Sequence, residues 1–282
     1  MNTLWFQFSS ELWKLFARKR TYLGFLAFVG LELAVLLIIK LVGLENWWRR
    51  LITMQGETFE NYFSGYTVGF IIMGLSIVLL GGLYLCLVSG DIVAKESEDG
   101  HMRLLLARPI SRFRLLALKF VSCQLYTLVL VWFVAVTSLF LGFMVRGTGG
   151  GLFAFTIEKG LLGIFTPAEA PGRYFLFSMM IALAMMTVTS VGFFFSCFKI
   201  KPAAATIAAL SYVLVDFILA RSGLMQSYSF LLFNTHLESW MEVLHEEIQW
   251  PIVIRSYTVM MAMNLTFFSI GVAAFESRDL KS

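Results

Sequence analysis

The chain has 282 residues, of which 59% are hydrophobic and only 14% carry a charged side chain, with a net charge of +4. This composition excludes an ordinary soluble domain and predicts a polytopic membrane protein. The apolar runs are about 20 residues long and hydrophobic on every side. They are therefore predicted to be transmembrane helices rather than the alternating strands of a β-barrel.

The first predicted element is an amphipathic helix over residues 3–18. Trp5, Phe8 and Leu12 recur at helical spacing, whereas Glu11 and the other polar side chains fall mostly elsewhere. The pattern is typical of a helix that lies in the membrane interface with its aromatic side buried. A basic cluster follows this helix instead of preceding it, so we expect a retained elbow helix and not a signal peptide.

Six apolar segments of spanning length follow, at residues 22–42, 66–89, 120–144, 174–197, 203–220 and 252–274. They predict an all-α protein in which residues 1–282 form a single transmembrane domain. A long connector over residues 222–251 is expected to lie on the extracytoplasmic side and to carry short helices.

Lysine and arginine are distributed unevenly around these segments. More than half of the 22 basic residues fall near the two termini, in the segment 91–113, or in the short link between the fourth and fifth spans. The positive-inside rule therefore predicts a multi-pass protein of the inner (plasma) membrane with both termini in the cytoplasm.

The segment 91–113 is the densest charged run in the chain, so it is expected to be a cytoplasmic loop. We expect a short helix from Ala94 to Leu106, with Gly100 weakening its middle or marking a bend. Pro109 bars its continuation, and Ser111 is a good N-cap for the helix of the third span. An amphipathic cytoplasmic helix of this kind needs a partner or the span ends to cover its apolar residues.

The pattern of Glu96, Gly100, the run LLLARPISR and Lys119 resembles the loop of the type-2 permeases of ATP-binding-cassette (ABC) transporters. In that family the loop is a coupling helix that docks on a separate ATPase. The resemblance implies an ATPase interface at Glu96, Glu98, Gly100, Arg103, Pro109, Ser111 and Arg112. It also implies a homo- or heterodimer of permeases that works with two ATPase subunits, which bind ATP and Mg²⁺ for a chain without a cofactor of its own.

The sequence contains no G-x-x-x-x-G-K-[ST] motif, so ATP would have to be bound by another chain. The three cysteines lie in apolar segments without metal-ligand spacing and are expected to be small buried side chains. All three histidines lie outside the spans, which disfavours an intramembrane enzyme. We expect neither a catalytic residue, nor a metal site, nor a nucleic-acid partner.

Two acidic residues fall within spans, Glu32 in the first and Asp216 in the fifth. Intramembrane charge is costly unless it faces a polar interior. Both residues are therefore candidates for the translocation path, and the alternative is a structural hydrogen bond inside the bundle. Lys40 and Lys119 lie near helix ends and are expected to snorkel toward water.

The function predicted is that of a non-catalytic membrane subunit of an ABC exporter embedded in membrane lipids. Two alternatives stay open. One is an ion-driven carrier, and the other is a role in the same family without export, such as mechanical coupling or anchoring a periplasmic maturation factor.

Overall fold

The computed structural model describes residues 3–100, 111–156, 160–222 and 226–277. Within them, six helical stretches are long and apolar enough to cross a membrane, namely Lys19–Leu41, Gly65–Glu98, Arg112–Arg146, Ala170–Ser196, Pro202–Arg221 and Trp250–Glu276. The predicted all-α membrane fold with six spans is confirmed.

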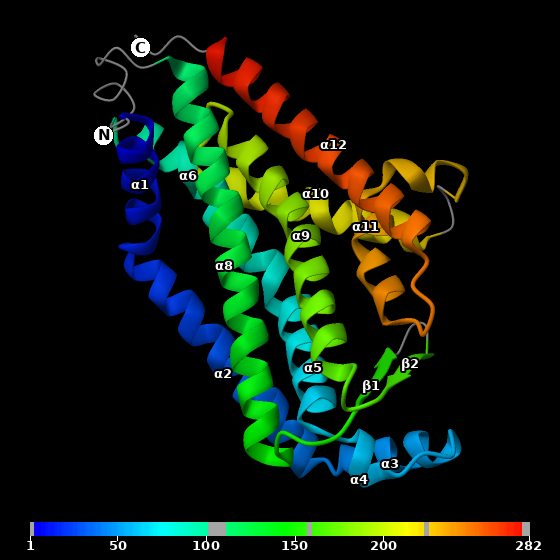
Figure 1. Cartoon of the computed structure of the whole chain (residues 1–282). Helices are drawn as coiled ribbons and strands as arrows, with labels where there is room; N and C mark the ends of the chain where they lie inside the picture. Colours follow the sequence, from blue (N-terminus) through cyan, green and yellow to red (C-terminus); the bar gives the residue numbers. More distant parts are fainter. Residues whose placement is uncertain (1–2, 101–110, 157–159, 223–225, 278–282) are drawn as a thin grey trace.

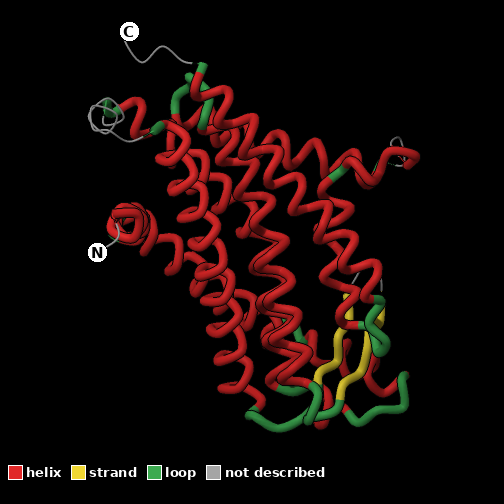
Figure 2. The backbone as a smooth tube through the Cα atoms, turned by 45° about the horizontal axis from the view of Figure 1, so that its top comes forward, coloured by secondary structure: helices red, strands yellow, loops and turns green. Residues whose placement is uncertain are grey.

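The long helices form one bundle with two different ends (Figure 1). At one end lie α1 (Thr3–Phe16), the last turns of α6 (Gly82–Glu98) and the last turn of α12 (Trp250–Glu276). We call this the charged end. At the other end lies a β-hairpin, which Figure 2 shows in yellow, and we call this the hairpin end. Helix α1 is seen almost along its axis in Figure 2, so it crosses the long helices steeply.

The second span is a single helical stretch with a change of winding inside it. It begins as α5 (Gly65–Ser76), passes through a π-helical turn, η1 (Ile77–Gly81), and continues as α6. Helix α5 packs chiefly on α8 (Arg112–Arg146), whereas α6 packs on α9 (Ala170–Ser196) and α10 (Pro202–Arg221). The two halves of this span therefore pack against different helices.

Glycine allows α5 and α8 to approach closely. A Cβ added at Gly142 would lie 2.2 Å from the carbonyl oxygen of Gly65 and 3.0 Å from the amide nitrogen of Gly69. Small residues at such crossings let the helix backbones come into contact. The resulting van der Waals packing drives helix association in a bilayer, where the hydrophobic effect does not act between helices. The two helices are thus held at a distance that only glycine permits.

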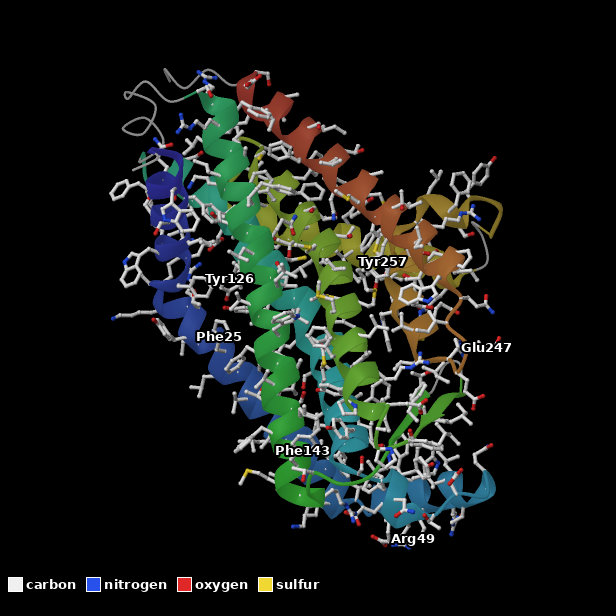
Figure 3. The ribbon with its side chains drawn as sticks, viewed as in Figure 1. Phe25, Arg49, Tyr126, Phe143, Glu247 and Tyr257 are labelled. Atoms are coloured by element: carbon white, nitrogen blue, oxygen red, sulfur yellow. The ribbon has the colours of Figure 1, made fainter. Side chains whose placement is uncertain are left out.

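Aromatic side chains fill the contact between α2 (Lys19–Leu41) and α8. Phe25 and Tyr126 face one another with ring centroids 6.2 Å apart (Figure 3). The predicted burial of Cys86, Cys123 and Cys197 is confirmed, and all three are free thiols. These contacts give the bundle a conventional apolar core.

A β-hairpin and an amphipathic helix that the sequence did not predict close the hairpin end. Strand β1 (Leu152–Thr156) pairs antiparallel with β2 (Gly160–Phe165) and lies against the amphipathic helix α3 (Leu44–Met54). Trp48 of α3 packs edge-on against Phe153, with ring centroids 6.1 Å apart. Two short helices lie nearby: α4 (Phe59–Tyr62) packs on α3, and the 3₁₀ segment η3 (Glu238–Leu244) packs on β2. Two others lie beside the long helices: α11 (Phe233–Leu237) packs on α10 (Pro202–Arg221) and α12, and the 3₁₀ segment η2 (Gln226–Leu231) packs on α11. The expected short helices of the connector 222–251 are therefore present among its described residues.

Arg173 at the start of α9 contacts several segments of the hairpin end. Its guanidinium donates hydrogen bonds to the carbonyl oxygens of Val243 (2.9 Å), His245 (3.2 Å) and Glu246 (3.0 Å). The same group lies 4.6 Å from the ring centroid of Phe165 in β2. One side chain thus joins α9, the hairpin and the end of η3.

Replacing Arg173 by lysine is expected to loosen the segment after η3. Lysine keeps the charge but cannot reproduce the planar fork that serves several carbonyls at once. Loss of one charged hydrogen bond is worth about 1.5–3 kcal/mol. Amide hydrogen exchange at residues 243–249 should therefore accelerate about tenfold or more. Arg255→Lys, at an exposed arginine of α12, should leave exchange in this segment unchanged, and equal exchange in both variants would contradict the role of Arg173.

Candidate functional site

The candidate site lies at the charged end, where two long helices continue past the length of a bilayer core. Helix α8 has 35 residues, which at about 1.5 Å per residue exceeds the roughly 30 Å of hydrocarbon. The α5–α6 stretch has 34 residues. Their extensions meet α1 at this end, and their charged residues come together there.

Lys119 is the centre of this meeting. Its side chain has 0% exposure, and its Nζ lies 2.6 Å from Glu11 Oε2 in α1 and 2.6 Å from Glu96 Oε2 in α6. Each carboxylate is itself at least nine-tenths buried. A buried ammonium is stable only when it is paired in this way. We call this buried group, made of Glu11, Glu96 and Lys119, the ionic junction.

Basic residues complete the junction on the elbow side. Lys14 Nζ donates to Glu11 Oε1 at 2.6 Å, and Arg18 Nη2 lies 4.0 Å from Glu96 Oε1. One turn earlier in α6, Asp91 forms an ion pair with Arg20 of α2. The junction therefore connects α1, α2, α6 and α8 at a single point.

The charges stabilise one another. Burial would raise the pKa of Glu11, but the Lys119 ammonium and the hydrogen bonds from Lys119 and Lys14 outweigh it, and the pKa lies below its ordinary value. Glu11 is thus ionised at neutral pH, and the attraction it contributes is present above its ordinary pKa. That contribution is lost only as the pH falls through the lowered value.

One sequence expectation at this point is wrong. Lys119 does not snorkel, because two carboxylates from other helices surround it and pair with its charge. Glu11 is buried within the chain and Trp5 is 68% exposed, so α1 turns Glu11 toward the bundle and Trp5 away from it. That α1 lies in the membrane interface with its aromatic side buried stays a prediction.

The structure describes five of the seven residues that were predicted to form an ATPase interface. Glu96 lies inside the ionic junction, whereas Glu98, the last residue of α6, is exposed. Helix α6 ends at Glu98, just before Gly100, which has a positive φ of 75°. Glycine in this conformation ends many helices. Residues 101–106 of the helix expected from Ala94 to Leu106 lie outside the described residues. Arg103 and Pro109 lie outside the described residues.

The start of α8 agrees with the sequence. Ser111 is its N-cap, and Ser111 Oγ accepts a hydrogen bond from the backbone N–H of Arg114 at 3.2 Å. Arg112 Nη1 donates to the carbonyl oxygen of Glu276 at the end of α12, 3.1 Å away. The segment 99–111 is therefore bounded on one side by the junction and on the other by a contact to the last helix.

The two intramembrane acids lie in different surroundings. Asp216 of α10 accepts hydrogen bonds from the backbone N–H groups of Phe233 (3.3 Å) and Asn234 (2.9 Å) and from Asn234 Nδ2 (2.7 Å). These hydrogen bonds hold the start of α11 against α10. Glu32 of α2 is fully buried against α8, with Thr137 Oγ1 2.9 Å from its Oε1. That Glu32 and Asp216 line a translocation path stays a prediction.

The ionic junction holds helices together by charge. It consists of ion pairs between the carboxylates of Glu11 and Glu96 and the ammonium of Lys119. Among the described residues, no group of three or more His, Cys, Asp or Glu side chains could hold a metal ion. The junction is suited to transmitting displacement between helices and not to covalent chemistry.

Comparison with known proteins identifies the family of this chain. A family model described as "ABC-2 family transporter protein" matches residues 18–266, which is most of the chain. The chain belongs to the ABC-2 transporter family. With its six long apolar helices, it is a multi-pass membrane protein of this transporter family. The resemblance first drawn from the charged segment is confirmed.

This ABC-2 permease is also similar to an uncharacterized protein, YhcI, of Bacillus subtilis (strain 168). The two are 32% identical over 111 residues, which is 38% of this chain and 36% of that protein. The match thus spans little more than a third of the relative's length and adds no activity to the assignment.

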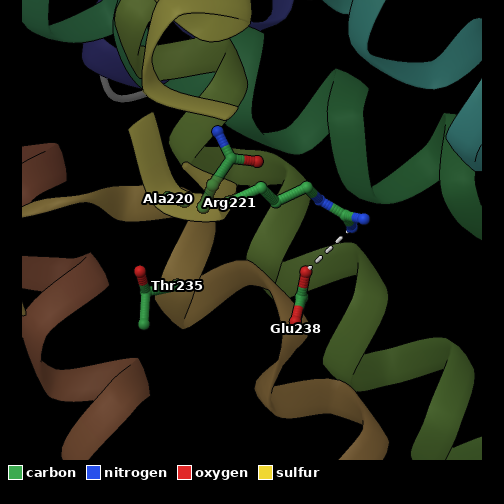
Figure 4. A pocket seen from close by; sticks show the side chains of 5 residues that line it. Ala220, Arg221, Thr235 and Glu238 are labelled. Atoms are coloured by element: carbon green, nitrogen blue, oxygen red, sulfur yellow. Dashed lines mark hydrogen bonds and ion pairs between the residues drawn. The ribbon is translucent and has the colours of Figure 1, made fainter. Parts of the chain in front are cut away.

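One open cavity of the ABC-2 permease lies away from the junction, beside α10 and α11 (Figure 4). It has a volume of about 410 Å³ and is lined by Ala220, Arg221, Asn234, Thr235 and Glu238. Arg221 and Glu238 are paired across it at 3.2 Å. Its charged groups therefore satisfy one another.

Proposed function

We propose that this chain is the permease subunit of an ATP-driven exporter. ATP hydrolysis in a separate ABC ATPase moves a substrate across the membrane, and ATP and Mg²⁺ are bound by that ATPase. Membership of the ABC-2 family supports this proposal. Both termini and the segment 91–113 would face the cytoplasm of the plasma membrane, in line with the distribution of basic residues.

The observation that carries the proposal is the ionic junction next to the segment 99–111. Glu96 is only a few residues before this segment, and Lys119 is two turns after it in α8. A force applied to the segment by a bound ATPase would reach α1, α6 and α8 together. A buried ion pair resists separation of its helices, because an unpaired buried charge is costly.

The assembly we propose contains two permeases and two ATPase subunits. Helix α10 supports a further contact, because it leaves much of its apolar surface exposed, including Ile207 (63%), Leu214 (57%) and Phe217 (41%). Such a surface suits lipid or a second permease. We propose that the substrate moves along the contact between the two permeases.

Charge reversal at Glu98 is expected to release the ATPase. Glu98 is the exposed acid of the predicted interface, so Glu98→Lys should leave the buried junction intact while placing a repulsive charge at the contact. Affinity purification of the tagged full chain from its own host membranes, followed by mass spectrometry, should recover an ABC ATPase with the wild type. We expect Glu98→Lys to recover at least tenfold less.

Glu247→Lys is the matched control, since Glu247 is an exposed acid at the hairpin end (Figure 3). It should recover as much ATPase as the wild type. Equal loss in both variants would point to a general charge effect, and recovery of no ABC ATPase with the wild type would overturn the proposed function.

A further inference from the structure

Glu32 is a buried acid that neither the ionic junction nor the helix contacts account for. Its side chain has 0% exposure, on the same face of α2 as the buried residues Phe28 and Val35. It lies in the middle of an apolar span, where an ionised carboxylate costs several kcal/mol unless it is paired. No cation lies within ion-pair distance of it among the described residues.

Its hydrogen bonds can be counted. Thr137 Oγ1 lies 2.9 Å from Glu32 Oε1, and it also lies 2.9 Å from the carbonyl oxygen of Phe133 and 3.2 Å from that of Val134. The second carboxyl oxygen of Glu32, Oε2, has no hydrogen-bond partner within the described part of the chain. A threonine hydroxyl has one hydrogen to donate and can also accept.

The count favours one protonation state. If Glu32 is ionised, Thr137 must give its only hydrogen to the carboxylate, and one anionic oxygen stays bare in the apolar bundle. If Glu32 is protonated, its O–H donates to Thr137 Oγ1, and Thr137 donates to Phe133 within its own helix. The second arrangement uses every donor and leaves no buried charge.

The neighbouring helices do not offset a negative charge. Helix α5 carries no Asp, Glu, Lys, Arg or His between Gly65 and Ser76, and α8 carries none between Phe120 and Val145. The titratable side chain that faces Glu32 from α9 is Tyr174, whose hydroxyl is 2.8 Å from the carbonyl oxygen of Ala135 and 3.0 Å from Ser138 Oγ. Its hydrogen is therefore used on α8.

Asp216 shows the opposite arrangement in the same protein. Both of its oxygens accept hydrogen bonds from N–H groups, two of them from the backbone. Three N–H donors favour a carboxylate. The two intramembrane acids are thus built for different states.

We infer that Glu32 is a proton-binding site inside the membrane. The neutral carboxyl group donates a hydrogen bond to Thr137 and joins α2 to α8 through it. When the two helices separate and water enters, the carboxyl group transfers its proton to a water molecule and becomes a carboxylate. This inference goes beyond the proposed function, because it needs neither an ATPase nor a substrate.

Infrared difference spectroscopy of the full chain in lipid nanodiscs at pH 7 tests the inference. The carbonyl stretch of a protonated carboxyl group is well separated from the bands of a carboxylate. The spectrum of the wild type minus Glu32→Gln should contain the band of the acid, and that of the wild type minus Asp216→Asn should contain carboxylate bands only. Thr137→Val should move the acid band to higher frequency, because it removes the acceptor of the Glu32 proton.

A second measurement uses the wild type alone, in case a variant does not fold. Protein that carries carboxyl-¹³C glutamate should show an acid band shifted by the label, since the other deeply buried glutamates, Glu11 and Glu96, are paired with Lys119. Carboxylate bands alone, in either experiment, would overturn the inference.

Discussion

Replacing Lys119 by methionine is expected to lower the free energy of unfolding by about 3–5 kcal/mol, because it leaves two buried carboxylates without a cation. Lys119 Nζ lies 2.6 Å from both Glu11 and Glu96 and is fully buried. Thermal unfolding of the purified chain in detergent, followed by circular dichroism, measures the change. The loss should exceed that of any single exposed charge.

Two further variants make this result specific. Lys40→Met removes an exposed lysine from the last turn of α2 and should cost little. The triple variant Lys119→Met, Glu11→Gln, Glu96→Gln removes the whole set of charges and should recover most of the lost stability, as replacement of complete buried ion sets often does. A Lys119→Met protein as stable as the wild type would mean that the lysine reaches water.

Replacing Gly142 by valine should separate α5 from α8. The first side-chain carbon alone would lie 2.2 Å from the carbonyl oxygen of Gly65, which belongs to the backbone and cannot rotate away. Overpacking of this kind costs about 1–3 kcal/mol or more. A disulfide introduced across the two helices, or a pair of spin labels, would report the longer distance directly.

The matched control is Gly30→Ala in α2. A Cβ at Gly30 has no neighbour within 4 Å, and alanine in place of an unconstrained helical glycine is favourable by about 0.5–1 kcal/mol. Opposite signs for the two glycines would show that close approach, and not helix propensity, decides the result at Gly142.

The spans could be predicted because one local property, a long apolar run, decides them. Ser111 also marks a helix start through its own chemistry, and α8 begins directly after it, as expected. The hairpin of residues 152–165 was not predictable in this way. Its strands are short, and the contact that stabilises them is with Trp48, far away in the sequence.

The candidate site was predicted in part. The composition of the charged segment is enough to predict a loop outside the membrane, and Glu96 belongs to that segment. The burial of Lys119 could not be predicted, because a lysine near a helix end usually reaches water. Its partner Glu11 lies 108 residues earlier, and only the folded bundle brings the two together. The same holds for Asp216, whose hydrogen-bond donors lie on a short helix after an intervening loop.

The π-helical turn over Ile77–Gly81 has a consequence for how the second span can move. Such a turn accommodates one more residue than an α-helical turn, so it offsets the two halves by about 100°. Straightening the turn to regular winding would swivel α6 against α5 by the same amount. Either α5 would lose its contact with α8, or α6 would lose its contacts with α9 and α10. Deleting a single residue there should produce a protein that retains one of these two contacts and loses the other.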